Sequence, residues 1–327
     1  LTQQSVDNVL ASLVTAGASN GTLGLDGGTN AAPSAAGLAD KATLESRGWT
    51  VNVNGEGIAN EIIAYKSTVE TAGGTVTDSE TELWNLFFAE VYDDGNSGTG
   101  NVGQFKDKFD LLWIPGLDLT TITKPLIGDD LTNNGFVAGD LNVSGLTGDG
   151  TSDLNTAITL ADVDYTSASA VVCGDYAESG SSVRMILGAN ETPQHFDIYV
   201  DSNVSFFGRI SPGNVKDGSF VATTLDDAIF TVNVTAANSL SIYEGLTLKS
   251  TDTDADTGGF TSTRTIDLFS REGEFKSLCT SRCIAIGEGL SDTERNIIYN
   301  ATAAYNTART QSIQVSSGDF TVTTATA

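Results

Sequence analysis

Near its end the chain changes from strand-like to helical periodicity within a few residues, and this change constrains the fold more than any other feature. A short apolar run at 284–286 is followed by a Gly-Glu-Gly turn. Ser291 and Glu294 then have the S-x-x-E spacing of a capping box, in which each side chain accepts a hydrogen bond from the backbone of the other. Apolar residues next recur at helical spacing, at Ile297, Ile298, Ala301, Tyr305 and Ala308. The pattern predicts a β-rich region that is closed by one surface helix.

The residues before this helix have the pattern of an antiparallel β-sandwich. Short apolar runs are separated by Gly, Asn and Asp turns at the spacing expected of sandwich strands. The runs are Ala170–Cys173, Val183–Leu187, Phe196–Val200, Phe206–Ile210, Ala228–Val234, Ser239–Tyr243, Thr263–Phe269 and Cys283–Ile286. Together with the closing helix they predict a sandwich domain over 113–310.

The first 56 residues predict a small α/β module. Val6, Val9, Leu10, Leu13 and Val14 recur at the spacing of an amphipathic helix, with Ser5 as its expected N-cap. A short strand follows at 22–25. A second helix, capped by Ser34, leads to an alternating strand at 49–53. The expected order is therefore helix, strand, helix, strand.

Two further segments complete the predicted organisation of an α+β chain with several domains. Residues 57–112 are expected to form a helical spacer, with a second capping box at Thr77 and Glu80 and a short amphipathic piece over Phe105–Leu112. Residues 311–327 form a β-prone tail, because Ile313, Val315, Phe320 and Val322 suit a strand. That tail could link subunits, complete its own sheet or lack regular structure.

The charge of the chain excludes one class of partner. Its 42 acidic and 16 basic residues give a net charge of −26. Because contacts with nucleic-acid phosphates need Lys and Arg, we expect no nucleic-acid binding. No apolar run is long enough to predict a membrane span. The single histidine, His195, lies beside a turn and excludes histidine-rich metal sites.

An acidic loop is the candidate metal site. Asp252, Asp254 and Asp256 alternate along the chain and are followed by Gly258. Carboxylates at alternate loop positions can point at one hard cation, and Ca²⁺ prefers six to eight oxygen ligands. We therefore expect Ca²⁺ as the one candidate cofactor, with a solvated acidic hairpin tip as the alternative. Thr263 stands where an EF-hand has its bidentate Glu, so the loop is not an EF-hand.

The cysteines allow a disulfide without requiring one. Cys279 and Cys283 are four residues apart, and a turn between them would bring their Cα atoms within disulfide distance. Two ordinary thiols remain the alternative. Cys173 lies in an apolar run and is expected to be a small core residue.

Aromatic residues supply the candidate ligand-binding positions, since aromatic rings can stack on sugar faces. Phe206, Phe207 and Tyr243 are the main candidates, together with Tyr199 and Trp113. Burial in the sandwich core is the alternative for each. Because neighbouring strand residues point to opposite faces, one of Phe206 and Phe207 is expected to leave the core. Acid pairs for glycan cleavage are few, and only Glu244 and Glu274 are candidates.

Three phrases of this sequence resemble a known family. The closing GEGLSDTE with its later Tyr, and FVAGDLNVSGLTGDGTSDLNTAITLAD, resemble concanavalin-A-like (laminin-G-like) jelly-roll domains of bacteriophage tail and other virion proteins. The first 56 residues resemble a leucine-rich-repeat-like module, although only about one repeat is present. The segment that begins VETAGGTVTDSE resembles the helical lead-in of the same phage proteins. The chain departs from the family where the usual LGRQV is replaced by residues 309–313.

This resemblance implies a function without catalysis. The chain would be a virion structural protein: a tail fibre, a receptor-binding component or a head-surface component. It would assemble through its N-terminal part with other virion proteins, as a homo-oligomer, and bind host surface glycan through the sandwich. A secreted bacterial surface adhesin is the alternative, and a glycan-cleaving enzyme is a third hypothesis.

Overall fold

The computed structural model describes most of the chain. The residues outside the described part are 26–29, 31–32, 54–57, 78–79, 82, 85–86, 88–107, 143, 177–182, 202–204, 214–216, 257, 272–277 and 317–327. The chain divides into two compact units, Leu1–Thr68 and Val69–Ala327. Helix α3 (Ile58–Thr71) runs from the first unit into the second.

The first unit confirms the predicted order of helix, strand, helix, strand. Its elements are α1 (Gln3–Thr15), β1 (Thr22–Leu25), α2 (Ala35–Ser46) and β2 (Thr50–Val53), and β1 pairs with β2 in parallel. Val6, Leu10, Leu44 and Val51 form its small core. Ser34 caps α2 as expected, but α1 begins earlier than predicted. The Thr2 side chain accepts a hydrogen bond from the Ser5 N–H and is the N-cap.

The second unit is an antiparallel β-sandwich with a jelly-roll-like architecture, as predicted. One sheet has seven strands in the order β12-β11-β10-β9-β16-β7-β4, and the other has eight, β15-β14-β13-β8-β17-β6-β5, with β3 also paired to β17. The strands are β3 (Phe109–Trp113), β4 (Thr132–Asn134), β5 (Leu141–Asn142), β6 (Gly145–Thr147), β7 (Asp153–Thr159), β8 (Ala168–Asp175), β9 (Arg184–Glu191), β10 (Gln194–Val200), β11 (Ser205–Ser211), β12 (Asp217–Val221), β13 (Ala228–Ala236), β14 (Ser239–Glu244), β15 (Thr247–Asp252), β16 (Thr265–Leu268) and β17 (Thr280–Gly287).

The core of this unit lies between the two sheets. Alternate residues of each strand point inward, as the period of two requires. Phe206 of the seven-stranded sheet and Phe230 of the eight-stranded sheet are fully buried, with ring centroids 4.2 Å apart. The inward-facing side chains of both sheets form one continuous apolar cluster.

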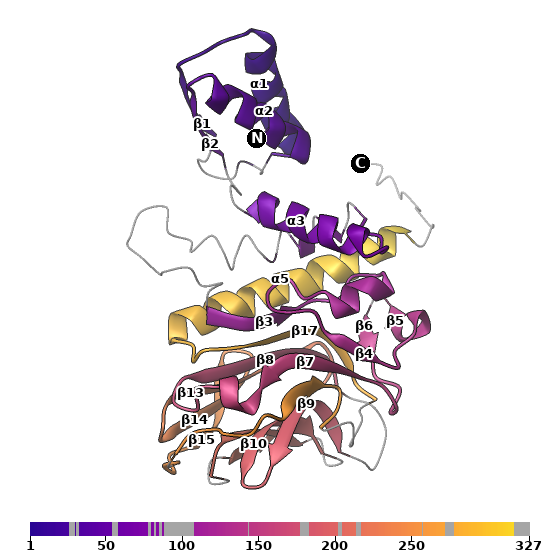
Figure 1. Ribbon diagram of the computed structural model, residues 1–327, viewed down its shortest axis with the longest axis vertical. Helices are drawn as coiled ribbons and strands as arrows, with labels where there is room; N and C mark the ends of the chain where they lie inside the picture. Colours follow the sequence, from indigo (N-terminus) through magenta and orange to yellow (C-terminus); the bar gives the residue numbers. More distant parts are fainter. Residues whose placement is uncertain are drawn as a thin grey trace, which may run out of the picture. The chain divides into compact units, whose positions relative to one another are not determined.

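Helix α5 (Asp292–Ser316) covers the outer face of the eight-stranded sheet (Figure 1). The predicted capping box is confirmed, because Ser291 N donates to Glu294 Oε2 over 2.7 Å and Glu294 N donates to Ser291 Oγ over 3.3 Å. Ile298 and Tyr305 are buried on the face that packs against the sheet. Within the described part of the chain, no helix has the length and apolar character needed to cross a membrane.

Two predicted boundaries are corrected by the structure. The amphipathic piece at Phe105–Leu112 is not helical at its end, because Phe109–Trp113 forms β3 and pairs with β17. The first part of the predicted β tail, with Ile313 and Val315, belongs to α5. No Gly or Pro interrupts residues 309–317, so the backbone continues its helical hydrogen bonds. Phe320 and Val322 lie outside the described residues.

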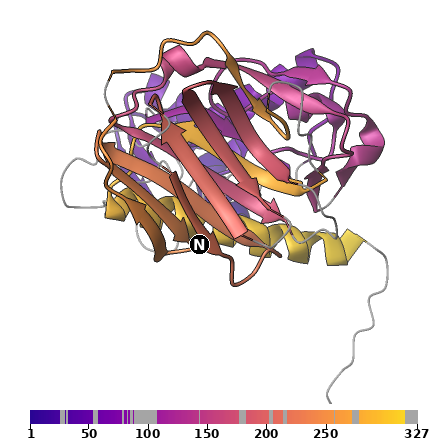
Figure 2. The same ribbon diagram turned by 90° about the horizontal axis from the view of Figure 1, so that it is seen from below.

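The outer face of the seven-stranded sheet lies on the side of the sandwich away from α5. In Figure 1, β9 and β10 lie at the opposite end of this unit from the helix. Seen from that side in Figure 2, the strands are drawn in front and α5 lies behind them. The two outer faces therefore have different surroundings, and the face without α5 is where a ligand can approach.

The Gly-Asp-Gly turn before β7 is held by one carboxylate. Asp149 Oδ1 accepts hydrogen bonds from the backbone N–H groups of Thr151 and Ser152, both over 2.7 Å, and Oδ2 accepts from both hydroxyls. Burial is the largest single influence and opposes ionisation, but the four hydrogen bonds together outweigh it and lower the pKa of Asp149 to about 2.

We expect Asp149→Ala to destabilise the protein at neutral pH and to have a much smaller effect near pH 2. A carboxyl with a lowered folded-state pKa stabilises above its unfolded pKa of 3.8, and this stabilisation is lost as the pH falls through about 2. Urea denaturation of both proteins at pH 7, 4 and 2 measures the difference. Asp254→Ala, which removes another exposed aspartate, is the control. An equal loss of stability at every pH would contradict the prediction.

Candidate functional site

A polar row crosses the outer face of the seven-stranded sheet. Strand register places one residue from each of six neighbouring strands in line: Asn155, Asp267, Gly188, Asp197, Arg209 and Asp217. We call this set the polar row. It is built from residues that are distant in the sequence, and only the pairing of the strands brings them together.

At the centre of the polar row, charged side chains pack closely around Gly188. A Cβ at this position would lie 3.1 Å from both Asp197 Oδ1 and Arg271 Cβ, so a larger residue would displace one of them. An Arg271 guanidinium nitrogen lies 3.4 Å from Asp197 Oδ2. Asn155 Nδ2 donates to Asp267 Oδ1 over 2.7 Å. Glycine thus leaves room for Arg271 to reach the buried Asp197.

The carboxylate of Asp197 is deeply buried although it lies on the outer side of its sheet. Its side chain is fully buried, and Oδ1 has no hydrogen-bond partner among the described residues. His195, on the same face of β10, is 6% exposed, and its Nδ1 lies 3.4 Å from Asp197 Oδ2. A buried acceptor without a donor costs about 1–3 kcal/mol, so a water or a ligand donor is expected here.

An aromatic pair borders the polar row. Tyr199 of β10 and Phe207 of β11 are register partners, and their rings stack with centroids 4.8 Å apart and planes within 6°. Both side chains are half-buried. Burial raises the pKa of Tyr199, while the nearby Arg209 lowers it and Asp197 raises it. The register of β10 and β11 places the aromatic pair two residues along from Asp197 and Arg209, on the same face of the sheet.

The other predicted aromatic ligand positions are structural. Phe206 is fully buried in the core, as one member of the adjacent pair had to be. Trp113 is also buried, and its ring meets Phe269 edge-on at 6.0 Å. Tyr243 is covered by α5, since the Arg295 guanidinium lies 3.7 Å from its ring centroid. Of the predicted aromatic ligand positions, Phe207 and Tyr199 are therefore the two that lie on the face away from α5.

The three loop aspartates do not meet. Asp252 accepts hydrogen bonds from the backbone N–H groups of Asp217 and Asp254, over 2.9 and 2.8 Å. Asp256 is buried and accepts from Ser211 Oγ over 2.8 Å. In the described part of the chain, no three His, Cys, Asp or Glu side chains form a group that could hold a metal ion. The loop therefore lacks the predicted three-carboxylate arrangement, and Ca²⁺ binding stays a prediction.

Of the two candidate catalytic glutamates, Glu244 lies in the described part of the chain. Glu244 accepts hydrogen bonds from the backbone N–H groups of Thr223 and Thr224 and forms an ion pair with Lys249 over 2.7 Å. Burial opposes its ionisation, but the contact with Lys249 and the hydrogen bonds from Thr223 and Thr224 lower its pKa. Glu274 lies outside the described residues.

The predicted disulfide between Cys279 and Cys283 is not formed. All three cysteines are described, buried and not bonded to one another. The pairing of β17 with β8 shifts register between Ser281 and Cys283, which marks a β-bulge. Cys279 belongs to the sandwich core, whereas Cys283 does not. The bulge therefore sends two cysteines of equal parity to opposite faces of the sheet.

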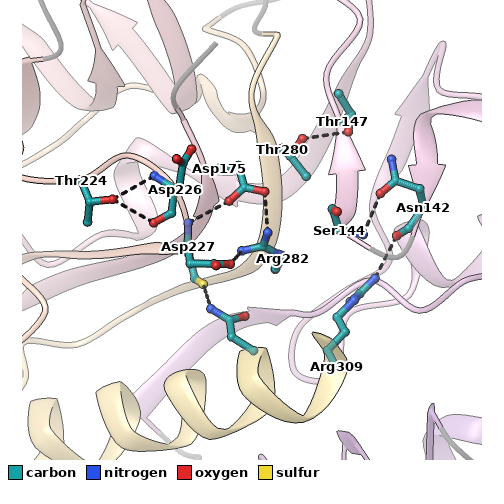
Figure 3. A network of polar contacts seen from close by, with 12 residues as sticks. Asn142, Ser144, Thr147, Asp175, Thr224, Asp226, Asp227, Thr280, Arg282 and Arg309 are labelled. Carbon is teal, nitrogen blue, oxygen red and sulfur yellow. Dashed lines mark hydrogen bonds and ion pairs between the residues drawn. The ribbon is translucent and has the colours of Figure 1, made fainter. Parts of the chain in front are cut away.

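The extra residue of this bulge, Arg282, makes a charged bridge. Its guanidinium donates to the carboxylates of Asp175 and Asp227, and Asp227 N donates to Asp175 Oδ1 over 2.8 Å (Figure 3). Arg282 is 8% exposed. Arg282 is buried while both aspartates are partly exposed, so loss of the aspartates would leave a buried positive charge without compensation, and Arg282 has a structural role in the eight-stranded sheet.

A second feature is an acidic cavity between the sheets at β3 and β7. Its volume is about 360 Å³, and Leu111, Leu131 and Ile158 supply its apolar lining. Asp110, Asp129 and Asp162 also line it. Burial raises the pKa of Asp110, and the negative charges of Glu288 and Asp162 raise it further.

Comparisons with known proteins identify no family. No family model matches the chain, and neither does any curated protein. Among solved structures, the botulinum neurotoxin serotype D binding domain is 15% identical, with a TM-score of 0.42 over 60% of this chain and 51% of that chain. The botulinum neurotoxin DC binding domain in complex with rat synaptotagmin II is 15% identical, with a TM-score of 0.45 over 60% and 52%. This chain spans about half the length of these domains.

We expect Asp110→Asn to stabilise the protein at neutral pH. A carboxyl whose folded-state pKa is raised destabilises the folded state where it is ionised, and this penalty disappears below its unfolded pKa of 3.8. Denaturation at pH 7 and pH 3 measures the change. A loss of stability at pH 7, or a gain of the same size at pH 3, would contradict the role assigned to charge.

Proposed function

We propose that the chain binds glycan through the outer face of its seven-stranded sheet, as a recognition component of a bacteriophage virion. The stacked Tyr199–Phe207 pair beside Asp197 and Arg209 carries this proposal. The binding role rests on the geometry of this face. The virion role rests on the resemblance of the sequence phrases.

The chemistry of the face suits a sugar. One side of a pyranose ring presents C–H groups, which pack against an aromatic surface, while its hydroxyl groups project from the ring edge. Half-buried aromatic rings provide apolar contact area with little loss of side-chain entropy. Charged groups beside them form the stronger class of hydrogen bond with hydroxyls. The aromatic pair and the neighbouring Arg209 and Arg271 combine both requirements.

The buried Asp197 adds a specific acceptor. Its Oδ1 and the Nδ1 of His195 have no hydrogen-bond partner among the described residues. Asn190 is the register partner of His195, and its buried Oδ1 also has no hydrogen-bond partner among the described residues. Because these atoms are buried, a sugar hydroxyl would reach them only after a neighbouring side chain such as Arg271 moved aside.

Cleavage of the glycan is the weaker alternative. Asp197 and Asp267 lie on either side of Gly188, which places two carboxylates on one face, as glycoside hydrolysis requires. However, Asp197 is fully buried beside Arg271, and Asp267 is 5% exposed and accepts from Asn155. Buried carboxylates that already have such partners are poorly placed to protonate a leaving group, so this arrangement favours binding over cleavage. We therefore propose a protein without catalytic activity.

The virion assignment predicts self-association. By its resemblance the chain would assemble through its N-terminal part, and a fibre or particle component would form a closed oligomer. A bacterial surface adhesin with the same sandwich would bind glycan without this requirement. The two readings therefore share the binding face and differ in assembly.

We expect Tyr199→Ala to weaken glycan binding about tenfold, because one aromatic stacking contact contributes about 1.5 kcal/mol. An array of neutral, amino and acidic glycans would identify the strongest ligand, and calorimetric titration would then give its affinity. Tyr299→Ala, which removes a partly buried tyrosine of α5, is the matched control and is expected to bind normally. Absence of any bound glycan, or equal affinity of both variants, would contradict the proposal. Release of reducing ends would favour the enzyme.

We expect light scattering of the full chain to give the mass of a closed oligomer such as a trimer. A monomer at all concentrations would contradict the virion assignment and favour the adhesin.

Light scattering and thermal denaturation in EDTA test the predicted binding of Ca²⁺. A fall in mass or melting temperature would give the Asp252–Asp256 loop a cation role, in spite of its separate carboxylates.

A further inference from the structure

Two cysteines that are distant in the sequence lie directly opposite each other in the eight-stranded sheet. Cys173 of β8 and Cys283 of β17 are register partners on adjacent antiparallel strands. We propose that Cys173 and Cys283 are a cross-link site, and form a disulfide when the chain folds in the presence of an oxidising small-molecule disulfide. The proposal concerns the sheet away from the glycan-binding face and does not depend on glycan binding.

The strand pairing brings the two Cα atoms within the range of a disulfide, and the Cβ atoms need to approach by up to about 1 Å. Opposite residues of an antiparallel pair have Cα atoms about 4.5–5.5 Å apart and Cβ atoms at a similar distance. Disulfides join Cα atoms about 4.4–6.8 Å apart and Cβ atoms about 3.5–4.5 Å apart. The register shift beside Cys283 marks a β-bulge, which increases the local twist of the strand.

Both thiols lie on the side of the sheet that α5 covers. Asn306 Nδ2 of α5 donates to Cys173 Sγ over 2.9 Å. Charges on Cys283 and on Cys173 would both raise the pKa of the buried Tyr305 hydroxyl of the same helix, so the two sulfur atoms share its surroundings. Cys279 is excluded as a partner, because it points into the sandwich core on the opposite side.

The chemistry balances with glutathione disulfide as the oxidant. The thiolate of one cysteine attacks glutathione disulfide, releases one glutathione and forms a mixed disulfide. The second cysteine then attacks this mixed disulfide and releases another glutathione. Two cysteine thiols become one disulfide, and one glutathione disulfide becomes two glutathione molecules.

The folded structure controls when this exchange can occur. Burial raises the pKa of Cys173 to about 11 and raises that of Cys283 well above its usual value, so few thiolates exist near pH 7. Helix α5 also blocks the approach of an oxidant. The bond is therefore expected to form while β8 and β17 pair and before α5 closes over them.

The test is refolding of the full chain from urea in a glutathione redox buffer. The products are alkylated in denaturant, digested and identified by mass spectrometry. We expect a peptide linking Cys173 to Cys283, with Cys279 alkylated, and a melting temperature that a reductant lowers by about 10 °C. Alkylation of all three cysteines in correctly folded protein would overturn the proposal, and so would a linked peptide that contains Cys279.

Two variants keep the result interpretable. Cys279→Ala should form the same cross-link, because Cys279 lies on the other face of the sheet. Cys283→Ser should lose both the linked peptide and the effect of the reductant on the melting temperature. If refolding fails, the natively purified protein is incubated with glutathione disulfide in 2 M urea and mapped in the same way. No Cys173–Cys283 peptide under either condition would overturn the proposal.

Discussion

The apolar layer between the two sheets determines the remaining architecture of the second unit. Phe206 and Phe230 meet across this layer, and the side chains that neighbour them in each strand must point away from it. Each sheet therefore presents a second face that the core does not use. One of these faces is covered by α5, and the other carries the polar row and the aromatic pair.

The β-bulge in β17 changes which of its side chains face the core. Before the bulge, Cys279 points into the core, and after it Cys283 points toward α5. The extra residue is Arg282, whose charge is matched by Asp175 and Asp227. A regular strand would have placed both cysteines on one face, which is why their spacing allowed a disulfide between them as well as two thiols. The bulge puts Cys283 opposite Cys173 instead.

Local patterns in the sequence predicted the main helices and strands, but only part of the proposed binding face. The capping box at Ser291 and the period-two runs identified the closing helix and the main strands, because these depend on neighbouring residues. The inference that one of two adjacent phenylalanines leaves the core was confirmed, with Phe207 as the outward residue. Asp197 and Asp267 were not identified from the sequence, because each is a single aspartate in its strand, with no second acidic residue at motif spacing. Their relation through Gly188 exists only once three strands are aligned.

The sequence by itself determined the antiparallel β-sandwich, the closing helix and the helix–strand–helix–strand order of the first unit. These features follow from periodicity, capping residues and turn residues, all of which act over a few positions. The tertiary structure decided the strand register that sets Cys173 opposite Cys283, the separation of the loop aspartates and the assembly of the polar row. These depend on strand order and register, which are set by contacts between residues far apart in the chain.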